Sequence, residues 1–318
     1  MNALKKPIFI VGAPRSGTTL LQYMLRSHPN ISLPTGESHF FIPLFRNEEG
    51  FGDLAEQENI RAVLEAMYKQ SADFLDTDIH GIQFDIDRLT EEFHAEGRVT
   101  MESIFSGLFE KNAIGEGKTR WGDKTPYYVL HMRMLLERFP DAQFIHLIRD
   151  GRDVAMSLLN RKHDFCVYNY FFAAKYWEIY VELGRECGQT LGEKTYHEVY
   201  YEDLLNNPET TMKGVCNFLG ESYSSSLVDF EKSSEAGKTP LLQKPIQKEN
   251  QAKWRTKMSP KQIETFERAV SKTLLSCNYP LMSTGKPLPL IVKLFWRIHN
   301  FALENSHRII KKLKQSEN

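Results

Sequence analysis

The segment of residues 7–21, with the sequence PIFIVGAPRSGTTLL, constrains the fold more than any other part of the chain. A short β-branched run leads through a glycine-bounded loop into the start of an apolar helix. In this arrangement unpaired backbone N–H groups and the positive end of the helix dipole point at one place. The segment therefore predicts a binding site for a phosphate or a similar anion at the end of the first strand.

The loop departs at one position from the phosphate-binding loop of nucleoside triphosphatases. The spacing from Gly12 to Gly17 is the same, but Thr18 stands where those proteins have lysine, and the cation lies inside the loop at Arg15. A P-loop kinase of small molecules is one alternative. It would need that lysine and an acidic strand end to bind Mg²⁺, and the sequence indicates neither. We expect an anionic ligand other than ATP, and no metal site.

The composition indicates a globular chain without a strongly charged partner. The 318 residues include 40 Lys and Arg against 41 Asp and Glu, so no nucleic-acid partner is expected. The four cysteines lack metal-ligand spacing, which predicts reduced thiols. No signal peptide or membrane-spanning stretch is evident, and we expect a cytoplasmic protein.

Strand and helix patterns alternate along most of the chain. Beyond the first strand, strands are expected at 30–33, 142–148 and 196–200, and helices at 18–27, 127–139, 151–160 and 208–219. Asn207 is the N-cap candidate of the last helix, and Gly220 can end it. The alternation predicts an α/β fold with a P-loop-like parallel sheet covered by helices on both faces. Residues 1–289 form this domain, with a helical insertion at 48–116.

A second strand-to-helix segment, LIRDGRDVAMSLL at 147–159, predicts a second phosphate site. It places Arg149 just beyond the expected strand and Ser157 two helical turns later. Ligands of open parallel sheets bind beyond the carboxyl ends of the strands. Arginine can bind a phosphate through two hydrogen bonds, and the serine hydroxyl adds a further donor.

Three shorter segments supply further candidate residues. Glu37 lies in a turn beyond the strand expected at 30–33. Lys124 lies in WGDKTP, which we interpret as a loop before a helix. Lys253 and Trp254 end the basic segment KPIQKENQAKW.

Together these motifs resemble the sulfotransferases that use 3'-phosphoadenosine-5'-phosphosulfate (PAPS). GAPRSGTTLL and LIRDGRDVAMSLL occur in the order found in that superfamily. The PRSGTT loop, the GE turn, GDKTP, YED and KPI…KW are similar to the protein-tyrosine sulfotransferase branch and its bacterial relatives. The resemblance implies an enzyme that moves a sulfuryl group from PAPS to an acceptor hydroxyl by in-line transfer, without a metal.

The resemblance also implies a role for each matching residue. Arg149 and Ser157 would hold the 3'-phosphate. Lys124 would reach the transferred sulfonate, and Glu37 would be the general base, with His39 as its rival. The 5'-phosphosulfate would be held by Arg15, Ser16, Gly17, Thr18 and Thr19, of which Arg15 would also meet the growing negative charge. The remaining nucleotide contacts would come from Tyr201, Lys253 and Trp254.

The acceptor and one donor contact stay open. The hydroxyl-bearing stretch that precedes KPI in that branch is not evident, and its nearest candidate, Thr239, stays unassigned. Peptide tyrosine, sugar, lipid and small phenol are all compatible with the sequence as acceptors. A catalytically silent nucleotide-binding protein of the same fold is the second alternative, which the presence of Arg15, Glu37 and Lys124 disfavours.

Residues 290–318 predict a basic amphipathic helix at the end of the chain. Apolar residues at Ile291, Leu294 and Ile298 follow helical spacing, with Lys293 and Arg297 interleaved. One interpretation is a peripheral contact with a membrane surface through 290–314. The other is a helix docked on its own domain or on a second subunit, as in a homodimer.

Overall fold

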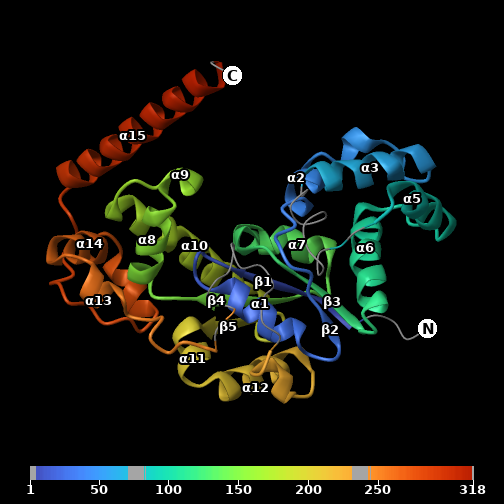
Figure 1. Ribbon diagram of the computed structural model, residues 1–318, viewed down its shortest axis with the longest axis horizontal. Coiled ribbons are helices and arrows are strands. Elements are labelled where there is room, and N and C mark those ends of the chain that lie inside the picture. Colours follow the sequence, from blue (N-terminus) through green and yellow to red (C-terminus); the bar gives the residue numbers. More distant parts are fainter. Residues whose placement is uncertain (1–4, 71–81, 83, 231–242, 244, 317–318) are drawn as a thin grey trace.

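The computed structural model describes residues 5–70, 82, 84–230, 243 and 245–316 as an α/β fold (Figure 1). Its sheet is parallel, with the strand order β2–β3–β1–β4–β5. The strands are β1 (Lys5–Gly12), β2 (Ile31–Ser32), β3 (Arg120–Lys124), β4 (Gln143–Ile148) and β5 (Tyr196–Tyr200). The predicted parallel sheet is confirmed.

The central strand β1 divides the core into two parts. Ile8 and Ile10 pack on one face, with residues of α1 (Thr18–Arg26), α11 (Tyr201–Asn206) and α12 (Pro208–Leu219). Phe9 and Val11 pack on the opposite face, with residues of α8 (Gly151–Asn160), α10 (Tyr170–Leu191) and α14 (Pro260–Ser276). This alternation is the period of two of a strand that is buried on both sides. Helices therefore cover both faces of the sheet, as predicted.

The prediction that Lys124 lies in a loop is wrong, because Arg120–Lys124 is strand β3. All five residues are buried, and the strand lies between β2 and β1. The sequence RWGDK lacks an apolar run, which is why it does not read as a strand. The Arg120 side chain is satisfied inside the fold, because it donates to Lys6 O at 2.7 Å, Leu219 O at 2.7 Å and Gln143 Oε1 at 2.5 Å.

Two helix predictions need smaller corrections. The helix expected at 127–139 is a 3₁₀ turn, η2 (Pro126–His131), followed by α7 (Met132–Arg138). Helix α12 ends at Gly220 in the left-handed conformation, as expected, but the Asn207 side chain makes no capping hydrogen bond. The proline at the first helical position needs no N–H acceptor, which reduces the need for a cap.

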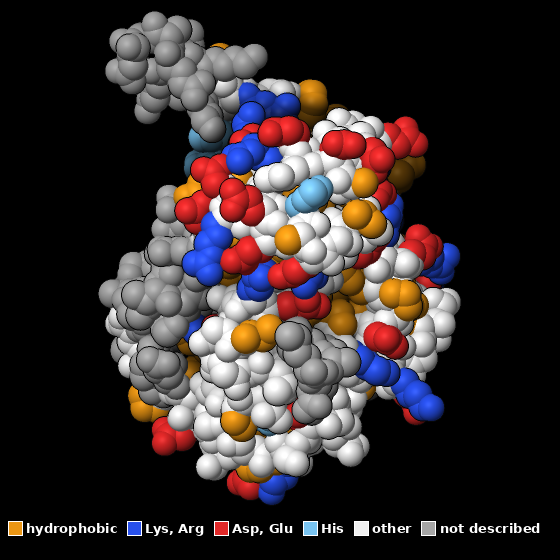
Figure 2. Space-filling view, turned by 90° about the vertical axis from the view of Figure 1, so that its right-hand side faces the viewer, with side chains coloured by type: hydrophobic (Ala, Val, Ile, Leu, Met, Phe, Trp, Pro, Cys, Tyr) orange, Lys and Arg blue, Asp and Glu red, His pale blue; other side chains and the backbone are white. Residues whose placement is uncertain are grey.

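The described part of 41–116 is helical. Its elements are α2 (Phe41–Arg46), η1 (Glu48–Phe51), α3 (Gln57–Gln70), α5 (Ile86–Ala95) and α6 (Met101–Gly115). The side of the molecule with these helices carries acidic and basic side chains close together (Figure 2). Arg98, for example, binds Glu96 at 2.7 Å and Glu110 at 2.9 Å. Such neutralised charge does not form a basic surface for nucleic acid.

Short elements complete the chain: α9 (Lys162–Phe165), η3 (Ser225–Leu227), α13 (Trp254–Lys257) and α15 (Leu290–Ser316). Helix α15 projects from the domain beside α9 (Figure 1). Asn300 fixes it there, because its side chain accepts from Tyr168 N at 2.8 Å and donates to Cys166 O at 3.0 Å. Among the residues that the structure describes, no helix is both long and apolar enough to cross a membrane.

The apolar residues of α15 face away from the domain. Ile291 is 77% exposed, Ile298 59% and Phe301 67%, whereas Asn300 on the opposite side is 1% exposed. The helix therefore docks through a narrow polar side and leaves its apolar face uncovered.

Candidate functional site

A cleft of about 1340 Å³ opens beyond the carboxyl ends of β1 and β4, and it collects most of the predicted site residues. Those lining it are Arg15, Gly17, Thr18, Thr19, Glu37, Arg149, Ser157, Tyr201 and Lys253. Ser16, Lys124 and Trp254 are buried beside it and are not among the lining residues. Thr239 lies outside the described residues. One cleft at this edge is where ligands of open parallel sheets bind.

The loop between β1 and α1 has the geometry of an anion cradle. Gly17 has φ 98°, and a Cβ there would lie 2.4 Å from the Tyr201 ring, so only glycine fits. No side chain caps α1, whose first N–H groups lack acceptors within the helix. The Ser16 hydroxyl is buried, and within the described chain it has no hydrogen-bond partner. These free donors fit an anion at the helix end.

Arg149 and Ser157 lie on the other side of the same cleft. The Arg149 guanidinium stacks 4.3 Å from the centre of the Tyr201 ring and donates to Asn250 O at 2.9 Å. Its buried Nε has no acceptor among the described residues. Ser157 accepts a hydrogen bond from Arg15 Nε at 3.0 Å, which links the two predicted anion sites. An unpaired guanidinium donor next to a hydroxyl is suited to a phosphate oxygen.

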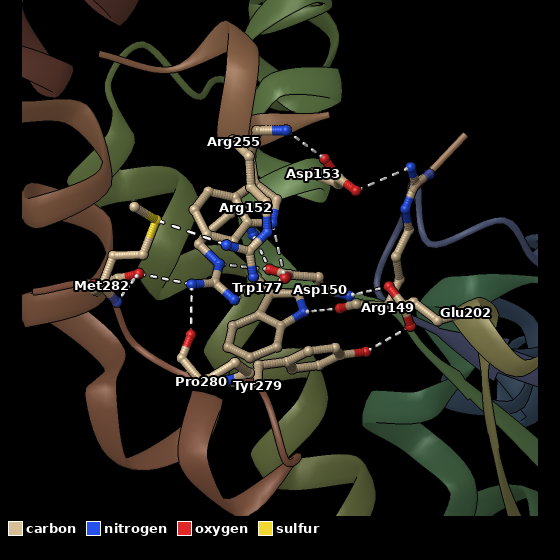
Figure 3. A network of polar contacts seen from close by, with 12 residues as sticks. Arg149, Asp150, Arg152, Asp153, Trp177, Glu202, Arg255, Tyr279, Pro280 and Met282 are labelled. Atoms are coloured by element: carbon tan, nitrogen blue, oxygen red, sulfur yellow. Dashed lines mark hydrogen bonds and ion pairs between the residues drawn. The ribbon is translucent and has the colours of Figure 1, made fainter. Parts of the chain in front are cut away.

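A buried network fixes the turn that presents Arg149 (Figure 3). Arg152 donates to both oxygens of Asp150, at 2.9 and 2.8 Å, and to Glu267 of α14 at 2.6 Å. The indole of Trp177 donates to Arg149 O at 3.0 Å (Figure 3). These contacts bind the backbone carbonyl of Arg149 and the side chains that follow it, so they hold the turn that carries Arg149 in place.

Trp254 belongs to this network. Its backbone N–H donates to Asp153 and its indole to Asp150, both at 3.0 Å, and Arg152 stacks 3.7 Å from its ring centre. The side chain is 1% exposed and does not line the cleft, where the sequence analysis expected it to contact the nucleotide. Its effect is to hold the neighbouring Lys253, which lines the cleft and donates to Asn250 Oδ1 at 2.5 Å.

Glu37, Lys124 and His39 form a cluster at the cleft wall. Lys124 Nζ donates to Glu37 Oε1 at 2.8 Å, and His39 Nε2 lies 2.9 Å from Glu37 Oε2. Burial opposes ionisation of Glu37, but the charge of Lys124 and the hydrogen bonds from His39 and Lys124 outweigh it and lower its pKa to about 2. Glu37 is thus a carboxylate at neutral pH, beside an ammonium group with two further N–H donors.

Asp123 is a further charged residue of this region, and the sequence analysis missed it. It precedes Lys124 in β3 and pairs with Phe9 of β1, so an acidic strand end does exist beside the loop, contrary to expectation. Its carboxylate oxygens are buried and have no hydrogen-bond partner in the described part of the chain. Burial raises its pKa to about 6. It does not line the cleft. Asp123 was missed because its segment, RWGDK, was interpreted as a loop and not as strand β3.

Aromatic residues line the same cleft as Glu37. They come from η2, the α9 segment and α10, and they are Tyr127, Phe165, Tyr170, Tyr176 and Tyr180. The sequence analysis did not assemble this wall, because its members lie in separate segments without a shared motif. Described residues offer no group of three or more His, Cys, Asp or Glu side chains that could hold a metal ion.

Replacing Arg152 with alanine should strongly destabilise the fold, because Asp150 and Glu267 would then be buried without their cation. Loss of one partner from a buried ion pair costs about 3–5 kcal/mol. Urea denaturation measures the free energy of unfolding. The matched control is Lys213→Ala, whose pair with Glu209 is more than half exposed and should contribute less than about 1 kcal/mol. Equal losses in the two variants would contradict this role of Arg152.

Asp123→Asn should stabilise the protein above pH 6 and have little effect near pH 4. The carboxyl pKa rises on folding from 3.8 to about 6, so the folded state holds the proton more tightly. The free energy of unfolding should therefore fall as the pH rises between these values and then level off. Denaturation of both proteins from pH 4 to 8 checks this, with the exposed Asp141→Asn as control. A pH-independent difference between wild type and Asp123→Asn would refute it.

Comparison with known proteins agrees with this geometry. The chain is 25% identical to protein-tyrosine sulfotransferase A of Caenorhabditis elegans, covering 93% of this chain and 74% of the relative. It is 24% identical to protein-tyrosine sulfotransferase 2 of Gallus gallus, covering 96% and 76%.

The sulfotransferase domain of the Synechococcus PCC 7002 olefin synthase shares the fold, with a TM-score of 0.61 and 23% identity over 87% of this chain and 97% of that one. A model of the sulfotransferase family matches residues 7–225, more than half of the chain. The loop, the cleft and this match agree, and the chain belongs to the sulfotransferase family.

Proposed function

We propose that this sulfotransferase moves a sulfuryl group from PAPS to an acceptor hydroxyl, with Glu37 as general base. The observation that carries the proposal is that one cleft is lined by two candidate anion sites and by Glu37, whose carboxylate is paired with Lys124. A donor with a 5'-phosphosulfate and a 3'-phosphate needs both anion sites. The relatives named protein-tyrosine sulfotransferases support a hydroxyl acceptor, of which a tyrosine hydroxyl is one example.

Each of the two anion sites would bind one of the charged groups of the donor. The loop of Arg15 and Ser16, with the uncapped end of α1, would hold the phosphosulfate. Arg149 and Ser157 would hold the 3'-phosphate, and each would exchange a present contact for one to the ligand. Tyr201 connects the sites, because its ring lies against Gly17 and under Arg149.

The transfer would be an in-line displacement at sulfur. The acceptor oxygen forms a bond to sulfur while the bond from sulfur to the phosphate oxygen breaks, and 3'-phosphoadenosine-5'-phosphate leaves. The proton of the acceptor hydroxyl passes to Glu37. Lys124 and Arg15 face the negative charge that grows on the leaving phosphate, and such preorganised charge is a large part of catalysis.

The low pKa of Glu37 fits a base that acts late. A carboxylate with a pKa of about 2 cannot remove a proton from a free alcohol or phenol in advance. The acceptor oxygen becomes far more acidic as its bond to sulfur forms, and the carboxylate then takes the proton. Lys124 uses one N–H for Glu37 and keeps two for the transferred sulfonate.

We also propose that α15 lies on an anionic membrane surface. Ile291, Ile298 and Phe301 form an exposed apolar face, and Lys293 and Arg297 have no ion-pair partner among the residues described. A long helix with a broad apolar face and free cations beside it is typical of helices that lie in a lipid interface.

Calorimetry should show that 3'-phosphoadenosine-5'-phosphate binds far more tightly than ATP, with or without EDTA. Arg149→Ala should weaken this binding about ten- to a hundredfold, or about 1.4–2.8 kcal/mol, because it contacts charge that is already present in the ground state. Arg15→Ala should lower kcat as well, since its partner charge grows during the reaction. Tight Mg²⁺-dependent ATP binding would overturn the donor assignment.

Glu37→Gln should lower kcat by about 10² to 10⁴, the usual contribution of a general base, while the affinity for 3'-phosphoadenosine-5'-phosphate stays near that of the wild type. His39→Ala is the matched variant, since it removes the other member of the hydrogen-bonded pair. Steady-state kinetics with PAPS separates the two. An active Glu37→Gln enzyme and an inactive His39→Ala enzyme would make His39 the base.

Truncation after Pro289 should abolish co-sedimentation with phosphatidylserine vesicles and leave the affinity for 3'-phosphoadenosine-5'-phosphate unchanged. The double variant Phe295→Ser, Ile298→Ser tests the apolar face within the full chain and should also lose vesicle binding. If the full chain does not bind vesicles and truncation converts a dimer into a monomer, the apolar face of α15 binds a second copy of the chain instead.

A further inference from the structure

Part of the cleft, called the aromatic wall below, is lined mainly by aromatic residues, none of which is assigned to the donor. Its residues are Tyr127, Met156, Phe165, Tyr170, Tyr176 and Tyr180. The side assigned to the donor is polar by contrast, with Arg149, Asn250 and Lys253. Glu37 lines the same cleft as the aromatic residues, so an acceptor that reaches Glu37 can also contact them.

We infer that the aromatic wall binds an uncharged aromatic hydroxyl compound, and that Tyr176 and Tyr180 hold its ring and orient its hydroxyl toward Glu37. The inference rests on the proposed sulfuryl transfer and adds the class of acceptor. An aromatic ring is the ligand that such a wall favours, because stacked or edge-on ring pairs contribute about 0.5–1.5 kcal/mol each beyond simple burial.

Tyr176 and Tyr180 form one unit on successive turns of α10. Their ring centres are 4.9 Å apart with an interplanar angle of 25°, and their hydroxyl oxygens are 3.1 Å apart. Phe165 meets Tyr176 edge-on at 6.2 Å. Three rings thus form a continuous surface, which is held in place by the helix and by the hydroxyl contact.

The tyrosine pair lines the same cleft as Glu37. Burial raises the pKa of Tyr176, and Tyr180 and the Glu37 carboxylate raise it further. Burial and the Glu37 carboxylate also raise the pKa of Tyr180. Both phenols therefore stay protonated at neutral pH and act as hydrogen-bond donors, not as bases.

The hydroxyl pair has one proton left for a ligand. In the contact between Tyr176 and Tyr180 one hydroxyl donates and the other accepts. The accepting hydroxyl keeps its own proton, for which the described residues offer no acceptor within hydrogen-bond distance. That proton can be donated to the oxygen of an acceptor hydroxyl whose own proton points toward Glu37.

The same wall is poorly suited to an acidic peptide or a sulfated sugar. Such ligands need unpaired cations near the acceptor. Of the cations that line the cleft, Arg161 is bound to Asp164 at 2.6 Å, and Lys257 lies near Lys253 and Arg149, which are assigned to the donor. Arg15 belongs to the loop assigned to the donor and donates to Ser157.

Acceptor competition tests the inference. With labelled PAPS we compare naphthol, a neutral tyrosine peptide, an acidic tyrosine peptide and an uncharged sugar. Naphthol should have the highest kcat/KM, at least about tenfold above the sugar, and acidic residues should give the peptide no advantage. Preference for the acidic peptide over the neutral one, or for the sugar over naphthol, would overturn the inference.

Substitutions of Tyr176 and Tyr180 test whether these two residues bind the acceptor. Tyr176→Phe and Tyr180→Phe should raise the KM for naphthol severalfold, and Tyr176→Ala should raise it further, with the affinity for 3'-phosphoadenosine-5'-phosphate unchanged. Tyr168→Phe is the matched control, because its hydroxyl contacts His163 at 3.3 Å and it does not line the cleft. Equal effects of Tyr168→Phe and Tyr176→Phe would refute the assigned role.

A binding measurement separates this inference from the proposed function. Naphthol fluorescence is titrated with the protein in the presence of 3'-phosphoadenosine-5'-phosphate. Absence of nucleotide binding would defeat the proposed function. Nucleotide binding without naphthol binding would defeat only the inference, whereas naphthol binding that is lost in Tyr176→Ala supports it.

Discussion

The structure depends on one buried cation, Arg152. It binds Asp150 through two hydrogen bonds, reaches Glu267 on α14 and stacks on Trp254. Three segments far apart in the sequence meet at this guanidinium, and an arginine is suited to this because its five donors lie in one rigid plane. The turn after β4 and the segment before α13 can hold their positions only while this charge is matched.

The network around Arg152 also fixes the backbone of two residues that line the cleft. Arg149 and Lys253 are each one to three residues from a member of the network, so their backbones are fixed even though their side chains face the ligand. Glu37, which lines the same cleft, is already paired with Lys124. The charges assigned to the proposed transfer are thus already positioned in the free protein.

The sequence predicted those parts of the site whose signals are local. β1 with its loop, β4 with α8, and β5 each combine an apolar run with a turn, and they occur where expected. Strand β3 was missed because Arg120, Asp123 and Lys124 make it look like a loop, and only tertiary contacts explain their burial. The position of Trp254 and the aromatic wall depend on segments distant in sequence, for which no local pattern exists.

Helix α10 has a further consequence for how this enzyme can diversify. Its buried residues, among them Trp177 and Val181, pack into the core, while Tyr176 and Tyr180 line the cleft from the same helix. No residue assigned to the donor lies on α10. Substitutions along this one helical stripe can therefore alter what the enzyme modifies without touching how it handles its activated sulfate, so a new specificity is within reach of a few point mutations.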